Sequence, residues 1–135
     1  KKEITFACII KSENPVPSDA KSATISYTKP SANTNVNLDA SIADYFSSDL
    51  FASIEVKKGT STSTYVLASS SSFRLYANTE MVITAAEGKE FYNVEFTTAE
   101  NKNGPYVVKV SEDHKTITII ASAQVRLTEI KVYYK

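Results

Sequence analysis

The stretch MVITAAEGKEFYNVEFT, which runs from Met81 to Thr97, shows the pattern that decides the fold. Apolar side chains recur at every second position on both sides of residues 87–89, namely Met81, Ile83 and Ala85 before them and Tyr92, Val94 and Phe96 after them. A period of two is typical of a β-strand with one buried face. Gly88 can adopt the positive φ of a tight turn, so we expect residues 87–89 to form a hairpin between two strands.

The same period continues along almost the whole chain. At residues 4–10 it predicts a strand that is apolar on both faces. Near the end the phase changes, because Val125 and Leu127 occupy odd positions whereas Ile130 and Val132 occupy even ones. A shift of one residue turns a strand's side chains to the opposite face, so we expect a β-bulge near residues 128–129.

Only residues 40–51 offer a helical alternative, with apolar residues at spacings of three and four and Ser41 as a cap; we expect one or two helical turns there. The sequence therefore predicts an all-β chain with about nine or ten short strands and at most one short helix near residues 40–50. Two antiparallel sheets must pack face to face, because a single open sheet would leave its apolar face in water. We expect a single β-sandwich domain over residues 1–135.

Composition excludes several classes of function. The chain has 135 residues, and 15 Lys and Arg balance 15 Asp and Glu, which does not favour nucleic acid or an anionic membrane as a partner. No apolar run approaches the ~18–20 residues of a membrane-spanning helix. One Cys rules out an internal disulfide, and one His argues against a His-based metal site.

The residues capable of catalysis form no known motif. His114 lies in an expected hairpin tip, residues 111–115, and is interpreted as a solvated turn residue, whereas Cys8 is interpreted as a buried, inert thiol. Asp39, Asp44 and Asp49 are spaced by five, which is not a one-face helical spacing, so turn capping explains them better than acid–base catalysis. A carboxylate-based glycoside hydrolase and a structural calcium ion stay as weaker alternatives. We predict no catalytic residues, no metal site and no cofactor.

Eight Tyr without any Trp suggest a surface for carbohydrate, because sugar faces stack on aromatic rings and sugar hydroxyls bind amide, guanidinium and hydroxyl groups. Tyr76 and Arg74 lie on one predicted strand, and Tyr65 and Tyr106 lie next to predicted loops. Asn103 belongs to the expected loop at residues 101–105. The five candidate ligand-binding residues are therefore Tyr65, Arg74, Tyr76, Tyr106 and Asn103. The alternative is that most Tyr are half-buried strand residues whose hydroxyls reach the rim.

Three segments carry a resemblance to a known family: SFRLYANT at residues 72–79, YNVEF at residues 92–96, and AQVRLTEIKV at residues 123–132. Together they resemble a β-sandwich module that recurs in secreted and surface proteins of gut bacteria. The resemblance covers residues 35–135 and leaves residues 1–34 as extra N-terminal strands. The module is similar to jelly-roll, galactose-binding-like domains, which implies a non-catalytic binding or spacer unit with Arg74 and Arg126 at matching motif positions.

Two functions follow as expectations. The first is a non-catalytic binding module of an exported or cell-surface protein that recognises a polysaccharide or glycan through its end loops. The alternative is a structural, assembly or adhesin-type subunit that binds protein partners, because an apolar strand such as residues 4–10 can pair with the sheet edge of a neighbour. We expect no nucleic-acid partner and no membrane span, an extracellular or cell-surface location, and no signal or anchor segment within this chain.

Overall fold

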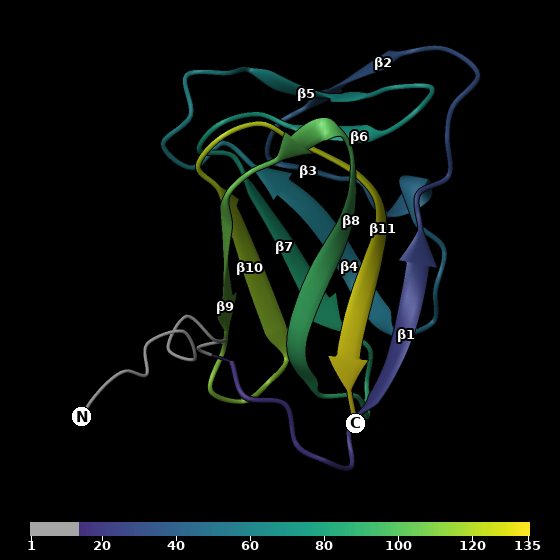
Figure 1. The fold of residues 1–135 in the computed structure, drawn as a ribbon, viewed down its shortest axis with the longest axis vertical. Helices are drawn as coiled ribbons and strands as arrows, with labels where there is room; N and C mark the ends of the chain where they lie inside the picture. The colour runs from purple at the N-terminus through teal and green to yellow at the C-terminus, as the bar shows by residue number, and fades with distance from the viewer. Residues whose placement is uncertain (1–13) are drawn as a thin grey trace.

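A computed structural model describes residues 14–135 and shows a two-sheet antiparallel β-sandwich, as the alternation predicted (Figure 1). The predicted strand at residues 4–10 and Cys8 lie outside the described residues. The elements are β1 (Lys21–Ser26), β2 (Thr34–Asn37), β3 (Ala40–Ser41), the 3-10 turn η1 (Ala43–Tyr45), β4 (Phe51–Lys57), β5 (Tyr65–Ala68), β6 (Phe73–Leu75), β7 (Glu80–Ala85), β8 (Phe91–Asn103), β9 (Tyr106–Val110), β10 (Thr116–Ala121) and β11 (Val125–Tyr134). Within residues 14–135 no helix is long and apolar enough to cross a membrane.

The described residues form eleven strands, more than the nine or ten expected, and two of them are long. Strand β8 has 13 residues and β11 has 10. At the other extreme β3 has only two residues, which is too short for a period of two to be visible in the sequence. The helical segment expected near residues 40–50 contracts to the single turn η1. The N-cap residue of η1 is Ile42 and not Ser41, although the Ser41 hydroxyl accepts a hydrogen bond from the Ala43 N–H.

The six-stranded sheet is organised around β11. Strands β1 and β6 pair with different parts of β11, and β8 also pairs with β11. From β6 the sheet continues with β5 and then with β2. The predicted bulge is confirmed, since the register shifts between Leu127 and Glu129. Because of this shift Leu127 and Ile130 are both buried although they have opposite parity.

The five-stranded sheet has the order β3-β4-β7-β10-β9. The expected hairpin tip at residues 111–115 joins β9 and β10, which pair from Val110 opposite Ile117 to Tyr106 opposite Ala121. The apolar faces of the two sheets meet in the core. Ile25, Ile54, Val94 and Ile119 all point inward and are at most 2% exposed, as a sandwich requires.

Residues 87–89 form a turn but not the hairpin that we expected. Gly88 has φ +83°, and the Lys89 N–H donates to the Ala86 carbonyl. The two flanking strands, β7 and β8, belong to different sheets, so this turn carries the chain across the sandwich. The buried residue at the start of β8 is Phe91 instead of Tyr92, because the register between β8 and β11 shifts between Tyr133 and Tyr134.

The expected loop at residues 101–105 is also shorter than predicted. Strand β8 continues to Asn103, and only Gly104 and Pro105 separate it from β9. The irregularity lies inside β8, where Glu100 and Asn101 have φ values of +59° and +58°. Asn103 lies opposite Val125, and Thr98 lies opposite Leu127. The four residues 99–102 therefore form a bulge opposite a single residue of β11, Arg126.

Four aromatic rings join the sheets at one end of the core. The Phe73 ring centroid lies 5.8 Å from those of Tyr27 and Phe46 and 6.0 Å from that of Tyr45. Phe73 itself is completely buried. Strands β2, β5 and β6 lie across this end, at the top of Figure 1, while β1 and the lower parts of β8 and β11 run along the length of the molecule.

Candidate functional site

The outer side of β2, β5, β6 and the start of β11 presents one continuous surface, which we call the upper face. The inward residues of these strands, such as Val36, Val66 and Leu75, are buried, so their chain neighbours point outward. The strand register fixes one row across the surface, in which Asn35 lies opposite Leu67, Leu67 opposite Arg74, and Arg74 opposite Arg126. The upper face consists of Asn35, Asn37, Tyr65, Leu67, Arg74, Tyr76 and Arg126.

Two tyrosines form the aromatic part of the upper face. Tyr65 begins β5 and Tyr76 follows β6 directly; their ring centroids are 6.1 Å apart and their planes meet at 88°. Tyr65 is 39% exposed, which makes it one of the few large apolar or aromatic side chains open to solvent in residues 14–135. Asn37 lies opposite Tyr65 on β2, so an amide adjoins an accessible ring.

Two arginines lie side by side in the row but differ in their partners. Arg126 Nη1 lies 2.6 Å from Glu100 Oε1 in an ion pair, and Arg126 Nε donates to Gln124 Oε1 at 2.6 Å. Glu100 reaches Arg126 because it lies in the β8 bulge. Arg74 makes no hydrogen bond or ion pair within residues 14–135, and its Nε is buried without an acceptor. Two positive charges directly opposite each other on neighbouring strands repel. Within residues 14–135 Glu100 neutralises the charge of Arg126, whereas no carboxylate neutralises that of Arg74.

The turn between β5 and β6 holds the two strands of the site in register. The Ser69 hydroxyl accepts hydrogen bonds from the Ser71 and Ser72 N–H groups, and the Ser69 N–H donates to the Ser72 carbonyl. The serine run at residues 69–72 was expected to be a loop or the polar beginning of a strand, and it is this turn. The Asn33 side chain accepts from the Ser70 N–H and ties the turn to the segment before β2.

Tyr27 supports the same turn from inside the core. Its ring is only 5% exposed, and its hydroxyl donates to the Ser69 carbonyl at 2.6 Å. Burial raises the pKa of the Tyr27 phenol to about 12, with a smaller contribution from Tyr45. The phenol therefore stays protonated, as it must to act as the donor. A buried hydrogen bond thus fixes the part of the chain that carries Tyr65 and Arg74.

The structure brings together three of the five residues predicted for the site: Tyr65, Arg74 and Tyr76. Tyr106 is engaged elsewhere, since its ring lies 4.7 Å from that of Phe96 and its hydroxyl accepts the Phe96 N–H. Asn103 is exposed, but it pairs with Val125 on the other side of β11 from β6. It is therefore separated from Arg74 and Tyr76 by the width of β11.

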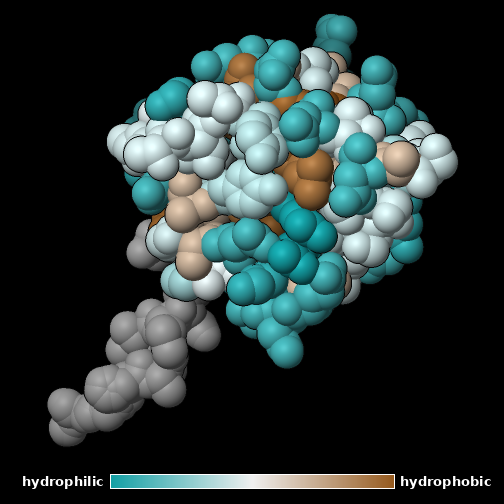
Figure 2. Space-filling view, turned by 90° about the horizontal axis from the view of Figure 1, so that it is seen from above, coloured by the Kyte–Doolittle hydropathy of each residue, from teal (hydrophilic) through white to brown (hydrophobic). Residues whose placement is uncertain are grey.

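Figure 2 looks down on the upper end of the molecule. Residues of intermediate and hydrophilic character cover most of it, and hydrophobic residues show through only in small, separate patches. This end therefore lacks the broad apolar area typical of a permanent protein interface. A mainly polar surface that also carries the Tyr65 and Tyr76 rings suits a ligand rich in hydroxyl groups.

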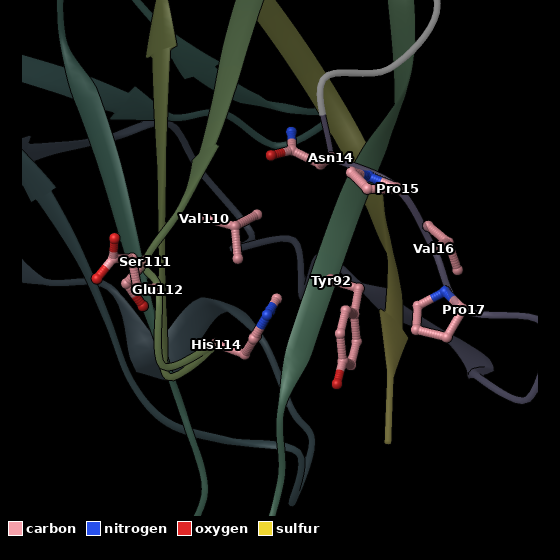
Figure 3. Close-up of a pocket in the computed structure, with 9 residues that line it drawn as sticks. All are labelled: Asn14, Pro15, Val16, Pro17, Tyr92, Val110, Ser111, Glu112 and His114. Carbon is pink, nitrogen blue, oxygen red and sulfur yellow. The ribbon is translucent and has the colours of Figure 1, made fainter.

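A pocket of about 490 Å³ lies near the other end of the sandwich, beside the β9–β10 turn (Figure 3). His114 and Tyr92 lie side by side in its lining, with ring centroids 4.3 Å apart, and His114 Nδ1 lies 3.0 Å from the Phe91 carbonyl oxygen. His114 is at the predicted turn, with φ +60°, but it is half-buried against Tyr92 instead of freely solvated. One wall is formed by residues 14–17.

The three aspartates considered for catalysis have local structural roles or lie free on the surface. Asp39, with φ +62°, accepts the Lys58 N–H at a turn, and Asp44 lies in the first turn of η1. All three, including Asp49, are exposed. In the part of the chain that the structure describes, His, Cys, Asp and Glu form no group of three or more able to hold a metal ion.

Several members of the upper face were not predicted from the sequence, namely Asn35, Asn37 and Leu67, and Arg126 was noted only through its motif position. Their proximity depends on strand pairing between distant segments, which the alternation of one strand does not reveal. No protein-family model matches the chain, and no curated protein or solved structure shows significant similarity to it. Its function has to be inferred from the upper face.

Proposed function

We propose that the chain is a non-catalytic carbohydrate-binding module of an exported or cell-surface protein, and that the upper face is its binding surface. The single observation that carries this proposal is the perpendicular pair of Tyr65 and Tyr76 on the same face as Arg74, which lies two residues before Tyr76 and opposite Leu67. The finer resemblance, to galactose-binding-like modules of gut bacteria, agrees with this proposal through the SFRLYANT segment, which supplies both Arg74 and Tyr76.

The chemistry of the upper face supports a sugar ligand in two ways. The exposed Tyr65 ring offers an apolar platform on which the C–H face of a sugar can stack. The amides of Asn35 and Asn37, both exposed on β2, can donate to and accept from hydroxyl groups. In this proposal the binding groups are carried by β2, β5 and β6 and by the residue directly after β6, in place of the end loops, so little ordering would accompany binding.

Titration calorimetry tests the proposal, with ligands chosen from a glycan array of plant and host polysaccharides. Tyr65→Ala should weaken binding of a positive glycan about tenfold, because it removes the stacking surface. Tyr133→Ala is the matched control, since Tyr133 lies on β11 away from the upper face with its hydroxyl on Glu95. The proposal would be contradicted if no glycan on the array bound the protein, or if Tyr65→Ala and Tyr133→Ala lost affinity equally. Hydrolysis of the bound glycan would contradict a non-catalytic role.

The exposed edge of β9 favours a second candidate function, that of an assembly subunit. Within residues 14–135, β9 pairs only with β10, and Val107 on β9 is 48% exposed. The Asn14 side chain donates to the Val108 carbonyl, so the chain leaves the described region directly beside this strand. The partner in this proposal is the apolar segment at residues 4–10 of a second copy, added to β9 as a further strand.

Size-exclusion chromatography with light scattering separates the two candidates. Deletion of residues 1–12 should convert an assembled species into monomer, and so should replacement of Ile4, Phe6 and Ile10 by Ser, which keeps the chain length. An intact chain that stays monomeric up to high concentration, unchanged by the deletion, would eliminate the assembly function. Tyr65→Ala should leave the oligomeric state as it is.

A further inference from the structure

We propose that the glycan bound at the upper face is acidic, carrying a carboxylate or sulfate group that Arg74 binds. This inference rests on the proposed function and specifies its ligand. It is carried by the charge balance of the upper face, by the difference between the two arginines, and by the position of Arg74 between an apolar and an aromatic side chain.

Within residues 14–135 the charge balance of the upper face leaves one positive charge, that of Arg74, without a partner. Arg74 and Arg126 are directly opposite each other on β6 and β11, whereas one carboxylate, that of Glu100, reaches this pair. Glu100 Oε1 accepts from Arg126 and Glu100 Oε2 lies 3.5 Å from the Ser72 hydroxyl, so both contacts of this carboxylate are to groups other than Arg74. An anion from outside the chain would balance Arg74 and relieve its repulsion with Arg126.

The two arginines are not equivalent as ligand-binding groups. Arg126 is held by Glu100 and Gln124 and is only 19% exposed, which makes it a fixed part of the sheet. Arg74 has its Nε buried beneath its neighbours, which holds the guanidinium close to the sheet, while no group of residues 14–135 accepts from its terminal nitrogens. A guanidinium fixed in this way offers a planar fork to carboxylate or sulfate oxygens.

The neighbours of Arg74 fit an anion that is attached to a sugar better than they fit a free ion. Leu67 lies opposite Arg74 on β5, and the pair of Tyr65 and Tyr76 lies one step further along the same two strands. A sugar ring stacked on Tyr65 can therefore direct an acidic substituent toward Arg74. Partial burial strengthens this contact, because solvent screens it less than it screens a surface lysine.

Matched polymers with and without the charge test the inference. Affinity is measured by calorimetry for polygalacturonate against its fully methyl-esterified form, and for dextran sulfate against dextran. We expect a charged polymer to bind at least about tenfold more tightly than its neutral counterpart, and the pair that shows this difference identifies carboxylate or sulfate as the group.

Variants then assign the effect to Arg74. Arg74→Met keeps the apolar stem and should remove the preference for the charged polymer, and Arg74→Lys should lose most of it because an ammonium lacks the fork. Lys109→Ala, which removes the same charge from the exposed side of β9, should leave the preference intact. Thermal unfolding of each variant verifies that it folds.

The outcomes separate the inference from the function on which it rests. Equal binding of charged and neutral polymers, lost in Tyr65→Ala, would overturn the acidic ligand and keep the carbohydrate module. A preference that falls equally in Arg74→Met and Lys109→Ala would reflect net charge alone and overturn the role of Arg74. Absence of binding to every polymer and every glycan would overturn both.

Discussion

Replacing Tyr27 by Phe should invert the order of stability between the variant and the parent protein as the pH rises. At neutral pH the variant loses the hydrogen bond from the phenol to the Ser69 carbonyl. Ser69 is 1% exposed, so no water replaces the lost donor. We expect the variant to be less stable at pH 8 by about 1–2 kcal/mol, the usual cost of leaving a buried acceptor without its partner.

The pKa of Tyr27 gives the sign of the change at high pH. Folding raises this pKa from 10.0 to about 12, so the unfolded chain loses the phenol proton at a lower pH than the folded protein does. The stabilisation from the protonated phenol is complete below pH 10 and is lost as the pH rises toward 12. At pH 11 the loss is about 1.4 kcal/mol, and over the whole interval it is about 2.7 kcal/mol.

Urea unfolding followed by circular dichroism at pH 8, 9, 10 and 11 measures both proteins. All the other titratable groups are common to both chains, so their contributions cancel in the difference between the two free energies of unfolding. The parent should be more stable at pH 8 and nearly equal to or less stable than the variant at pH 11. A difference that stays constant from pH 8 to pH 11 would refute this reasoning.

Three further predictions test the architecture by urea unfolding. Phe73→Ala should destabilise by about 3–5 kcal/mol, because it empties a fully buried site among three other rings, and a loss below about 1 kcal/mol would contradict that packing. Ser69→Ala should cost about 1–2 kcal/mol, since two backbone N–H groups of the β5–β6 turn lose their acceptor; an unchanged midpoint would show that the turn holds without it. Gly59→Ala should destabilise more than Gly88→Ala, by about 1 kcal/mol. Both glycines have positive φ, but a Cβ at Gly59 would lie 2.9 Å from the backbone carbonyl oxygen of Asn78, whereas no atom lies within 4 Å of a Cβ at Gly88. Equal effects of the two glycine variants would argue against this crowding.

The fold class was predictable because alternation is a local property. Each strand shows its buried face through its own residues, and the bulge in β11 appeared as a change of parity between Leu127 and Ile130. Pairing is not local. The turn at Gly88 has the same sequence whether it joins neighbours in one sheet or crosses between sheets, so the expected hairpin was wrong.

The candidate site was predictable only in part, for the same reason. Arg74 and Tyr76 could be associated because they lie two residues apart on one strand, and Tyr65 because it lies near a loop. The proximity of Arg126 arises from its register with Arg74, which depends on two segments about fifty residues apart. Tyr106 looked equivalent to Tyr65 in the sequence, and only packing distinguishes them, because Phe96 covers its ring and uses its hydroxyl.

The place of β11 at the centre of the six-stranded sheet determines the order in which the chain can fold during synthesis. Strands β1, β6 and β8 all pair with β11, although the ribosome makes β11 after every one of them. The five-stranded sheet uses only earlier segments and can assemble first, but its apolar face stays uncovered until β11 emerges. Unpaired strand edges and uncovered apolar faces promote association of incomplete chains, so a domain that lacks β11 is the species most open to it.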